Sequence, residues 1–226
     1  MAVRPLLYYI TDRTGFPGDE AARRRRLLEK IVEAALAGVD YIQLREKDLS
    51  ARELETLARD AVSIVRESMH PQGRGSTALL INSRTDVALA VGADGVHLRS
   101  DDVSPRNIRE IWSRSGSGGQ TRAWTRAGPV LGVSCHTFEE VAEAAAQDAD
   151  FAAFAPVFEK KDALSTPAAG LAQLREASQA RIAVLALGGV SLFNARSCLD
   201  AGAAGIAGIR LFQENDLEHV VRLLRG

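Results

Sequence analysis

Short apolar runs alternate along this chain with stretches in which apolar residues recur at helical spacing. Residues 6–11 form the first apolar run, and residues 20–37 then carry apolar side chains three and four positions apart, up to Gly38. The runs are apolar at successive positions rather than at every second one, which is typical of parallel strands covered on both faces. We predict eight strands, at residues 6–11, 39–44, 78–82, 94–98, 130–133, 151–158, 182–187 and 204–209, each followed by a helix.

Eight strand–helix units are the number that closes a TIM (β/α)8 barrel, and we predict one such domain over residues 1–226. A doubly wound open sheet is the alternative, but the chain has no Gly-x-Gly-x-x-Gly after the first strand. Helix-start signals agree with the units, since Ser50 and Glu53 have capping-box spacing and Ser104 precedes Pro105. Residues 114–129 show no periodicity and are predicted to form a flexible surface loop.

The composition of the chain limits the classes of partner and the cellular location that we expect. With 28 Lys and Arg against 29 Asp and Glu, the formal charge is −1, which argues against nucleic acid or membrane recruited by bulk charge. Cys135 and Cys198 have neither metal-ligand spacing nor a disulfide pattern, so we expect a cytoplasmic location. No stretch approaches 18 apolar residues and the N-terminal apolar run is too short for a signal peptide, so we expect a soluble protein. The sequence leaves homo-oligomer formation open.

The second strand ends in charged residues. In an extended chain Gln43, Arg45 and Lys47 point to one side, because every second residue shares a face. A guanidinium beside an ammonium suits a phosphate or diphosphate, and an amide suits the edge of a heterocycle. Taken alone, the pattern also fits an edge strand with a solvated polar face.

Other strand ends supply matching groups, and in a barrel they meet at the C-terminal mouth. Carboxylates beside cations suit Mg²⁺, which shares its coordination shell with substrate phosphates and water. Paired glycines before a helix that Ser191 is predicted to open suit a second phosphate. The strand-end groups are Asn82, Asp101, Asp102, Ser134, His136, Lys160, Lys161, Gly188 and Gly189.

Four motifs together resemble the thiamine phosphate synthase family. They are Gln-Leu-Arg-Glu-Lys-Asp at 43–48, Gly-Ala-Asp-Gly-Val-His-Leu at 92–98 followed by Asp102, Gly-Val-Ser-x-His-Thr at 132–137 and Gly-Gly-Val at 188–190. The resemblance implies a TIM-barrel transferase of thiamine biosynthesis that joins 4-amino-2-methyl-5-(diphosphooxymethyl)pyrimidine to a thiazole phosphate. It also implies Mg²⁺ as cofactor, small phosphorylated partners and a dissociative reaction that releases diphosphate without a protein nucleophile.

Residue by residue, the resemblance places the pyrimidine diphosphate on Gln43, Arg45, Lys47 and Asn82. Ser134 would lie near the pyrimidine or the diphosphate, and Lys160 would contact the diphosphate. Arg45, Lys47, Ser134 and Lys160 are therefore the expected catalytic residues. Asp102 would bind Mg²⁺, and the residues expected at the thiazole phosphate are Gly188, Gly189, Ile209 and Arg210.

This chain also departs from the family pattern. Ser83 stands at the position of a second Mg²⁺-binding Asp, which leaves Asp101, Asp86 or the diphosphate itself as substitutes and predicts weaker Mg²⁺ affinity. The segment 157–161 is shorter than in the family and lacks its threonines. Arg210 stands where the family commonly has Ser, and its guanidinium would bind phosphate in place of the lost hydroxyls.

Two other functions stay open. The related TenI-like thiazole tautomerases use a His at the position of His136 as acid and base, but they tend to lose the Gln and Lys that this chain has at Gln43 and Lys47. A non-catalytic sensor of phosphorylated ligands is the third interpretation, since a fold does not fix a function. His97 and His219 are interpreted as structural.

Overall fold

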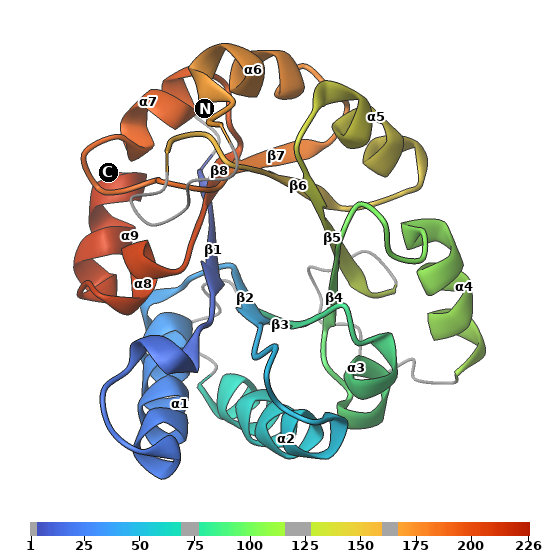
Figure 1. The fold of residues 1–226 in the computed structure, drawn as a ribbon, viewed down its shortest axis with the longest axis vertical. Helices are drawn as coiled ribbons and strands as arrows, with labels where there is room; N and C mark the ends of the chain where they lie inside the picture. Colours follow the sequence, from blue (N-terminus) through green and yellow to red (C-terminus); the bar gives the residue numbers. More distant parts are fainter. Residues whose placement is uncertain (1–3, 69–76, 116–127, 160–166) are drawn as a thin grey trace.

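The computed structural model describes residues 4–68, 77–115, 128–159 and 167–226. Within these ranges eight parallel strands form a closed barrel in chain order, with helices around the outside (Figure 1). The prediction of a TIM barrel is confirmed. The strands are β1 Leu6–Ile10, β2 Tyr41–Leu44, β3 Ala78–Asn82, β4 Gly95–Leu98, β5 Val130–Cys135, β6 Phe151–Phe154, β7 Ala183–Ala186 and β8 Gly205–Gly208.

Two helices start where the capping signals at Ser50 and Ser104 indicated. Ser50 and Glu53 form both hydrogen bonds of a capping box, and Ser104 caps the helix that begins at Pro105. Gly38 ends the first long helix in the left-handed region, at φ 82°. The helices are η1 Arg13–Gly15, α1 Glu20–Ala37, α2 Ala51–Glu67, α3 Thr85–Val91, α4 Pro105–Arg114, α5 Phe138–Ala146, α6 Gly170–Ala177, α7 Ala195–Asp200, α8 Arg210–Gln213 and α9 Leu217–Arg225.

Two apolar layers hold the barrel. Large side chains fill its interior, where the ring of Tyr41 stacks on that of Phe151 with centroids 5.0 Å apart and Tyr8 meets Phe151 edge-on. Outside the strands, aliphatic residues pack between sheet and helices in a second, larger cluster. The interior layer forms the floor beneath the C-terminal mouth, so polar groups above it are held on a packed surface.

Three aspartates close the opposite, N-terminal end of the barrel. Asp40, Asp94 and Asp150 stand at or just before strand starts, and each accepts a backbone N–H from the preceding strand, of Leu7, Leu79 and Leu131 respectively, at 2.7–2.8 Å. Charge-assisted bonds of this kind fix strand register without serving the mouth.

Two predictions concerned the segment 114–129 and the end of the sixth strand. The segment predicted as a flexible loop, 114–129, lies mostly outside the described residues. The sixth strand was predicted to reach residue 158 but ends at Phe154, where a cis peptide bond joins Ala155 to Pro156 and Pro156 has no N–H for a strand ladder. In the part of the chain that the structure describes, no helix is both long and apolar enough to span a membrane.

Candidate active site

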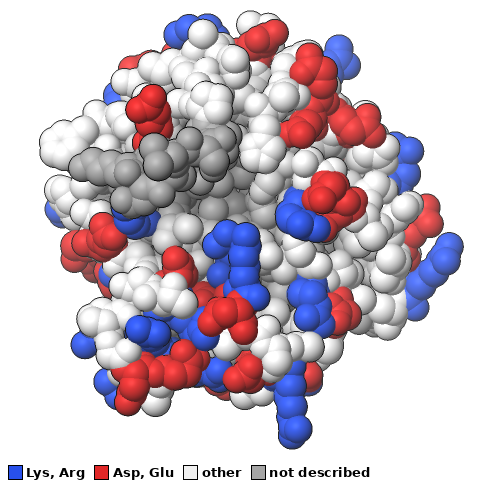
Figure 2. Space-filling model, viewed as in Figure 1, with Lys and Arg blue, Asp and Glu red and all other residues white. Residues whose placement is uncertain are grey.

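The C-terminal strand ends surround a cavity of about 1040 Å³. Figure 2 shows basic side chains beside the hollow near the centre of this face. Lys160, and Lys161 beside it, lie outside the described residues, and Asp102 and Ser83 are not among the residues that line the cavity. The lining does include most of the residues expected from the sequence, namely Gln43, Arg45, Lys47, Asn82, Asp101, Ser134, His136, Gly188, Gly189, Ile209 and Arg210.

A buried arginine holds the loop after β2. Arg13, only 4% exposed, donates two hydrogen bonds to the carboxylate of Asp48, at 2.6 and 2.8 Å, and a third to Glu46 at 3.2 Å. Hydrogen bonding by Arg13 lowers the pKa of Asp48 to about 2. Glu46 is thereby turned away from the cavity that Arg45 and Lys47 line. This is the alternation that an extended chain predicts.

A chain of hydrogen bonds links five strands at the bottom of the cavity. Tyr8 Oη donates to Gln43 Oε1 at 3.0 Å, and Gln43 Nε2 donates to Asn82 Oδ1 at 2.7 Å. On its other side Tyr8 Oη lies 2.9 Å from His97 Nδ1, and His97 Nε2 lies 2.8 Å from Ser134 Oγ. Because β1 to β5 are adjacent in the barrel, residues up to 89 positions apart meet in one row.

The direction of each proton in this chain follows from burial. Burial, with the positive charge of Arg45, lowers the pKa of His97 to about 3, so the imidazole is neutral. The single Tyr8 proton goes to Gln43, so Tyr8 accepts from His97 Nδ1–H. His97 Nε2 is then an acceptor, and Ser134 donates to it. Ser134 therefore faces a ligand as an acceptor, whereas Asn82 offers its amide nitrogen as a donor.

The acidic edge of the mouth is centred on Asp102. Its Oδ2 accepts from Ser83 Oγ and from the Arg99 backbone N–H, both at 2.8 Å. Its Oδ1 accepts from Arg99 Nη2 at 3.1 Å and Nε at 3.3 Å. Burial alone would raise the pKa of Asp102, but the hydrogen bonds from Arg99 and Ser83 hold it below its usual value. The carboxylate is ionised, as a metal ligand must be.

The residues at this edge fit Mg²⁺ held partly by substrate. Among the described residues no three His, Cys, Asp or Glu side chains gather as a metal cage. Mg²⁺ commonly takes one or two protein carboxylates and completes its shell with phosphate oxygens and water. Asp102 meets that minimum, and Asp101 lies at the cavity with its carboxylate 3.4 Å from Arg99. Asp86 is engaged elsewhere, in a bidentate pair with Arg84 at 2.6 and 2.8 Å.

His136 lies on the cavity wall after β5. Its Nδ1 is 2.6 Å from the carbonyl oxygen of Ala155, which can only accept, so Nδ1 carries the proton. In the neutral ring, Nε2 is then the acceptor. His136 therefore offers Nε2 as an acceptor, whereas both ring nitrogens of His97 are used in the hydrogen-bond chain.

The glycine pair after β7 makes a close turn against the loop after β6. Gly188 and Gly189 have φ of 90° and 66°, and a Cβ on Gly188 would lie 2.7 Å from the Cα of Pro156. Only glycine tolerates both conditions. The prediction that Ser191 opens the next helix is wrong. Asn194 Oδ1 accepts the Ser191 N–H at 2.7 Å and Asn194 Nδ2 donates to Gly189 at 3.0 Å, so the loop continues to α7.

The end of β8 differs from the expected simple strand–helix step. Gly208 ends the strand and Arg210 begins the four-residue helix α8, so Ile209 and Arg210 stand at the cavity on a tight turn. The Ile209 carbonyl accepts from the N–H groups of Phe212 and Gln213, at 3.1 and 2.9 Å. Arg210 is therefore positioned by backbone hydrogen bonding rather than by strand geometry.

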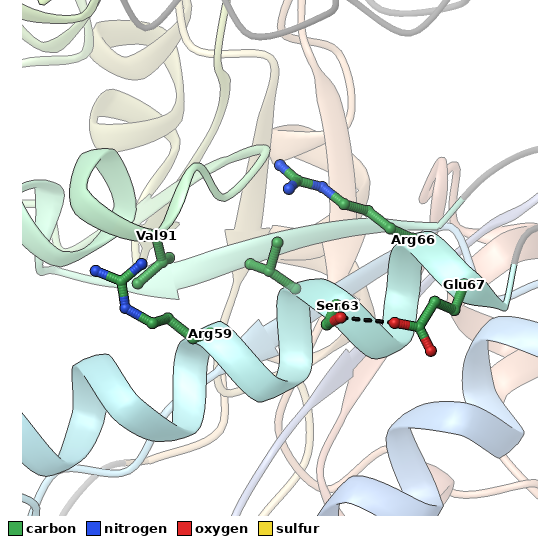
Figure 3. Close-up of a pocket in the computed structure, with 6 residues that line it drawn as sticks. Arg59, Ser63, Arg66, Glu67 and Val91 are labelled. Atoms are coloured by element: carbon green, nitrogen blue, oxygen red, sulfur yellow. Dashed lines mark hydrogen bonds between the residues drawn. The ribbon is translucent and has the colours of Figure 1, made fainter.

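A second hollow lies on the outside of the barrel. It is lined by side chains of α2 and α3, among them Arg59, Arg66 and Val91, and measures about 440 Å³ (Figure 3). Arg66 donates to the Gly92 carbonyl at 2.8 Å, and Ser63 donates to Glu67 at 2.7 Å. No residue that the sequence predicted for a site lines it. The larger, central cavity is the candidate site.

Tyr8, Arg13 and Arg99, which hold or line the site, are among the residues that were not identified from the sequence. Tyr8 lies within an apolar strand, where alternation alone gives it no sign of a polar role. Arg13 begins the short helix η1 after β1 and Arg99 lies in the loop after β4, where a charged residue is ordinary. The one available signal was position, because both follow directly on the C-terminal ends of barrel strands.

Comparisons with known proteins agree with this geometry. The family model described as thiamine monophosphate synthase matches residues 7–212. A putative thiamine-phosphate synthase of Geobacter sulfurreducens is 41% identical over 89% of this chain and 83% of its own, and the thiamine-phosphate synthase of Syntrophomonas wolfei is 35% identical over 97% and 94%. The thiamine phosphate pyrophosphorylase of Pyrococcus furiosus superposes with a TM-score of 0.74 at 29% identity, over 99% of this chain and 95% of that one. The chain belongs to the thiamine monophosphate synthase family.

Proposed function

We propose that this protein is a thiamine-phosphate synthase, a transferase that moves the aminopyrimidinylmethyl group from diphosphate to the ring nitrogen of a thiazole phosphate. One observation carries the proposal: a single cavity of about 1040 Å³ is lined by two amides, two cations and a glycine turn, which are Gln43, Asn82, Arg45, Lys47, Gly188 and Gly189. That volume is at the upper end of small-molecule sites and has room for two substrates. The names of the relatives support the same reaction.

Recognition of the aminopyrimidine would use the hydrogen-bond chain. An aminopyrimidine has ring nitrogens that accept and an exocyclic amine that donates. Asn82, whose Oδ1 is taken by Gln43, offers its Nδ2 protons to a ring nitrogen, and Ser134 offers an acceptor to the amine. The directions set by Tyr8 and His97 are therefore those that this heterocycle requires.

The diphosphate would lie against Arg45 and Lys47. Charge that develops on the departing diphosphate is stabilised by a bidentate guanidinium and a point-charge ammonium already in place. Mg²⁺, when bound by Asp102 and the diphosphate, would supply further charge neutralisation. We assign Lys160 to the same leaving group on the family resemblance. No side chain needs to attack the substrate, because the thiazole nitrogen is the nucleophile.

The thiazole phosphate would lie between the loops after β7 and β8. Gly188 and Gly189 bring backbone close to the cavity, and Ile209 and Arg210 face it from the other side. A phosphate site after the seventh and eighth strands is frequent in barrels of this kind. Arg210 supplies the charge that hydroxyl groups alone would not. A cytoplasmic location agrees with Cys135 and Cys198, which are buried and unpaired.

The test is to mix both phosphorylated substrates with Mg²⁺ and to quantify thiamine phosphate by fluorescence after oxidation. We expect turnover that falls at least about 100-fold in Arg45→Gln, since a lost charge-stabilising donor costs about 10²–10³ in rate. Arg59→Gln, on the outer hollow, removes the same charge far from the cavity and should retain full activity (Figure 3). A wild-type protein without turnover would refute the proposal.

A thiazole tautomerase is the second candidate, and the geometry of His136 favours it. With Nδ1–H held by Ala155, Nε2 can take a proton from a ligand and return it. Isomerisation of the thiazole tautomer in the absence of the pyrimidine substrate, abolished by His136→Ala, would support this activity. Ligand binding with neither turnover would indicate a sensor.

A further inference from the structure

Arg99 both lines the cavity and pairs with Asp102. Its side chain is 62% exposed and lines the cavity, which it shares with Arg45 and Lys47. The same guanidinium donates from Nη2 and Nε to Asp102 Oδ1, at 3.1 and 3.3 Å. A residue that lines a polyanion site thus also holds the carboxylate expected to bind Mg²⁺.

The carboxylate of Asp102 is saturated. Two carboxylate oxygens have about four acceptor positions. Ser83 and the Arg99 backbone use those of Oδ2, and the Arg99 guanidinium uses those of Oδ1. A cation can reach Oδ1 only if the guanidinium leaves. The Arg99 side chain is 62% exposed and water screens its pairing with Asp102, so the exchange costs little free energy.

The charge at this edge of the mouth is also less negative than it would be with Asp at position 83. Ser83 is neutral, and Arg99 pairs with both Asp101 and Asp102, so the three residues together carry a net charge of only about −1 before any ligand binds. Mg²⁺ would therefore meet less negative potential than two carboxylates provide. A guanidinium, in turn, can bind a diphosphate in bidentate fashion without a metal.

We propose that Arg99 competes with the divalent cation for Asp102 and, once displaced, binds the diphosphate as a further cation beside Arg45 and Lys47. This inference rests on the proposed synthase function and makes Arg99 a substrate-binding residue of that site. The diphosphate is then held by protein cations to a greater extent than by metal, which compensates for Ser83.

Two binding measurements on the full chain test the proposal without turnover. The first titrates Mn²⁺, as a paramagnetic probe for Mg²⁺, into ligand-free protein and follows free Mn²⁺ by EPR. Arg99→Gln should bind Mn²⁺ more tightly, by up to about fivefold, because the exposed Arg99–Asp102 ion pair no longer opposes binding. The second titrates inorganic diphosphate in EDTA by calorimetry. Arg99→Gln should bind diphosphate about tenfold more weakly, and Arg99→Lys should recover part of the loss.

Arg59→Gln is the matched control, because Arg59 is 58% exposed and pairs with Glu55 on the outer face of α2. It should change neither affinity. An Arg99→Gln protein whose Mn²⁺ affinity or diphosphate affinity equals that of wild type overturns the proposal. Since neither measurement needs a reaction, absence of thiamine phosphate synthesis beside both expected shifts would refute the synthase function and leave the role of Arg99 toward diphosphate and cation intact.

Discussion

Replacing Ser83 by Asp restores a second carboxylate beside Asp102, and we expect a protein that is less stable without Mg²⁺ and more stable with it. The Ser83 backbone already lies in the left-handed region, at φ 53°, where Asp and Asn are several-fold enriched. Ser83 Oγ is 2.8 Å from Asp102 Oδ2, so the new carboxylate would lie within about 4 Å of it. The substitution therefore adds charge without adding backbone strain.

The magnitude follows from that separation. Two like charges about 4 Å apart near a protein surface repel by about 4 kcal/mol. Arg99 cancels part of this repulsion, and water screens the exposed guanidinium, so we expect a net loss of about 1–2 kcal/mol in the free energy of unfolding at pH 7. Repulsion raises the pKa of the new carboxylate above its unfolded value. The loss is consequently absent below about pH 4, grows as the pH rises above that value and is complete once the pH exceeds the raised pKa.

Urea unfolding at pH 7 in EDTA and in excess Mg²⁺ measures the effect. Ser83→Asn is the control, since it has the same shape and backbone preference without the charge. In EDTA Ser83→Asp should be the less stable of the two, and Mg²⁺ should reverse the order, because a bound ion stabilises the folded state by mass action. Equal stability of Ser83→Asp and Ser83→Asn under both conditions would show that residue 83 does not face a cation site.

Three further predictions use other parts of the site and the barrel. Tyr8→Phe leaves buried partners unpaired in the hydrogen-bond chain, so it should cost about 1–3 kcal/mol of stability and raise KM for the pyrimidine substrate, whereas Tyr9→Phe, whose hydroxyl bonds Gln213 outside the cavity, should leave KM unchanged in steady-state kinetics. Arg13→Gln should lower stability at neutral pH, and its difference from wild type should shrink as the pH falls from about 4 to about 2, because the lowered pKa of Asp48 makes that pair stabilising only while Asp48 is ionised; acid titration by circular dichroism measures this. Asp94→Ala should lower the free energy of unfolding by about 1–3 kcal/mol through the lost hydrogen bond to Leu79, measured by urea unfolding, with kcat/KM unchanged because Asp94 lies at the opposite end of the barrel.

Local periodicity was enough to predict the barrel and the face of β2. The alternation in residues 43–47 predicted Arg45 and Lys47 on one side and Glu46 on the other, and the structure places Arg45 and Lys47 at the cavity and Glu46 against Arg13, although β2 ends at Leu44 and Lys47 lies in a turn. Helix starts at Ser50 and Ser104 are equally local, since each cap bonds a residue three positions on.

Part of what the sequence could not predict depends on closure of the barrel, and part depends on side-chain bonding within one loop. Tyr8 looks like any core residue until β1 lies beside β2, which brings its hydroxyl to Gln43. The loop after β7 was predicted as a helix because Ser191 is a good capping residue, but the side chain of Asn194 bonds the backbone of Ser191 and Gly189 and keeps the loop irregular. In both cases a contact that local propensity does not encode decides the outcome.

His97 shows why a structural residue and a site residue need not be different things. It is buried among aromatic rings, as a core histidine is, and it also joins Tyr8 to Ser134. A protonated His97 would donate from both nitrogens, so Ser134 would have to accept from it and would present its proton, not its lone pairs, to the ligand. The low pKa that burial and Arg45 impose therefore sets the polarity of Ser134. Arg45, the cation proposed to hold the diphosphate, thus helps burial to keep Ser134 in the hydrogen-bonding state that an exocyclic amine would require.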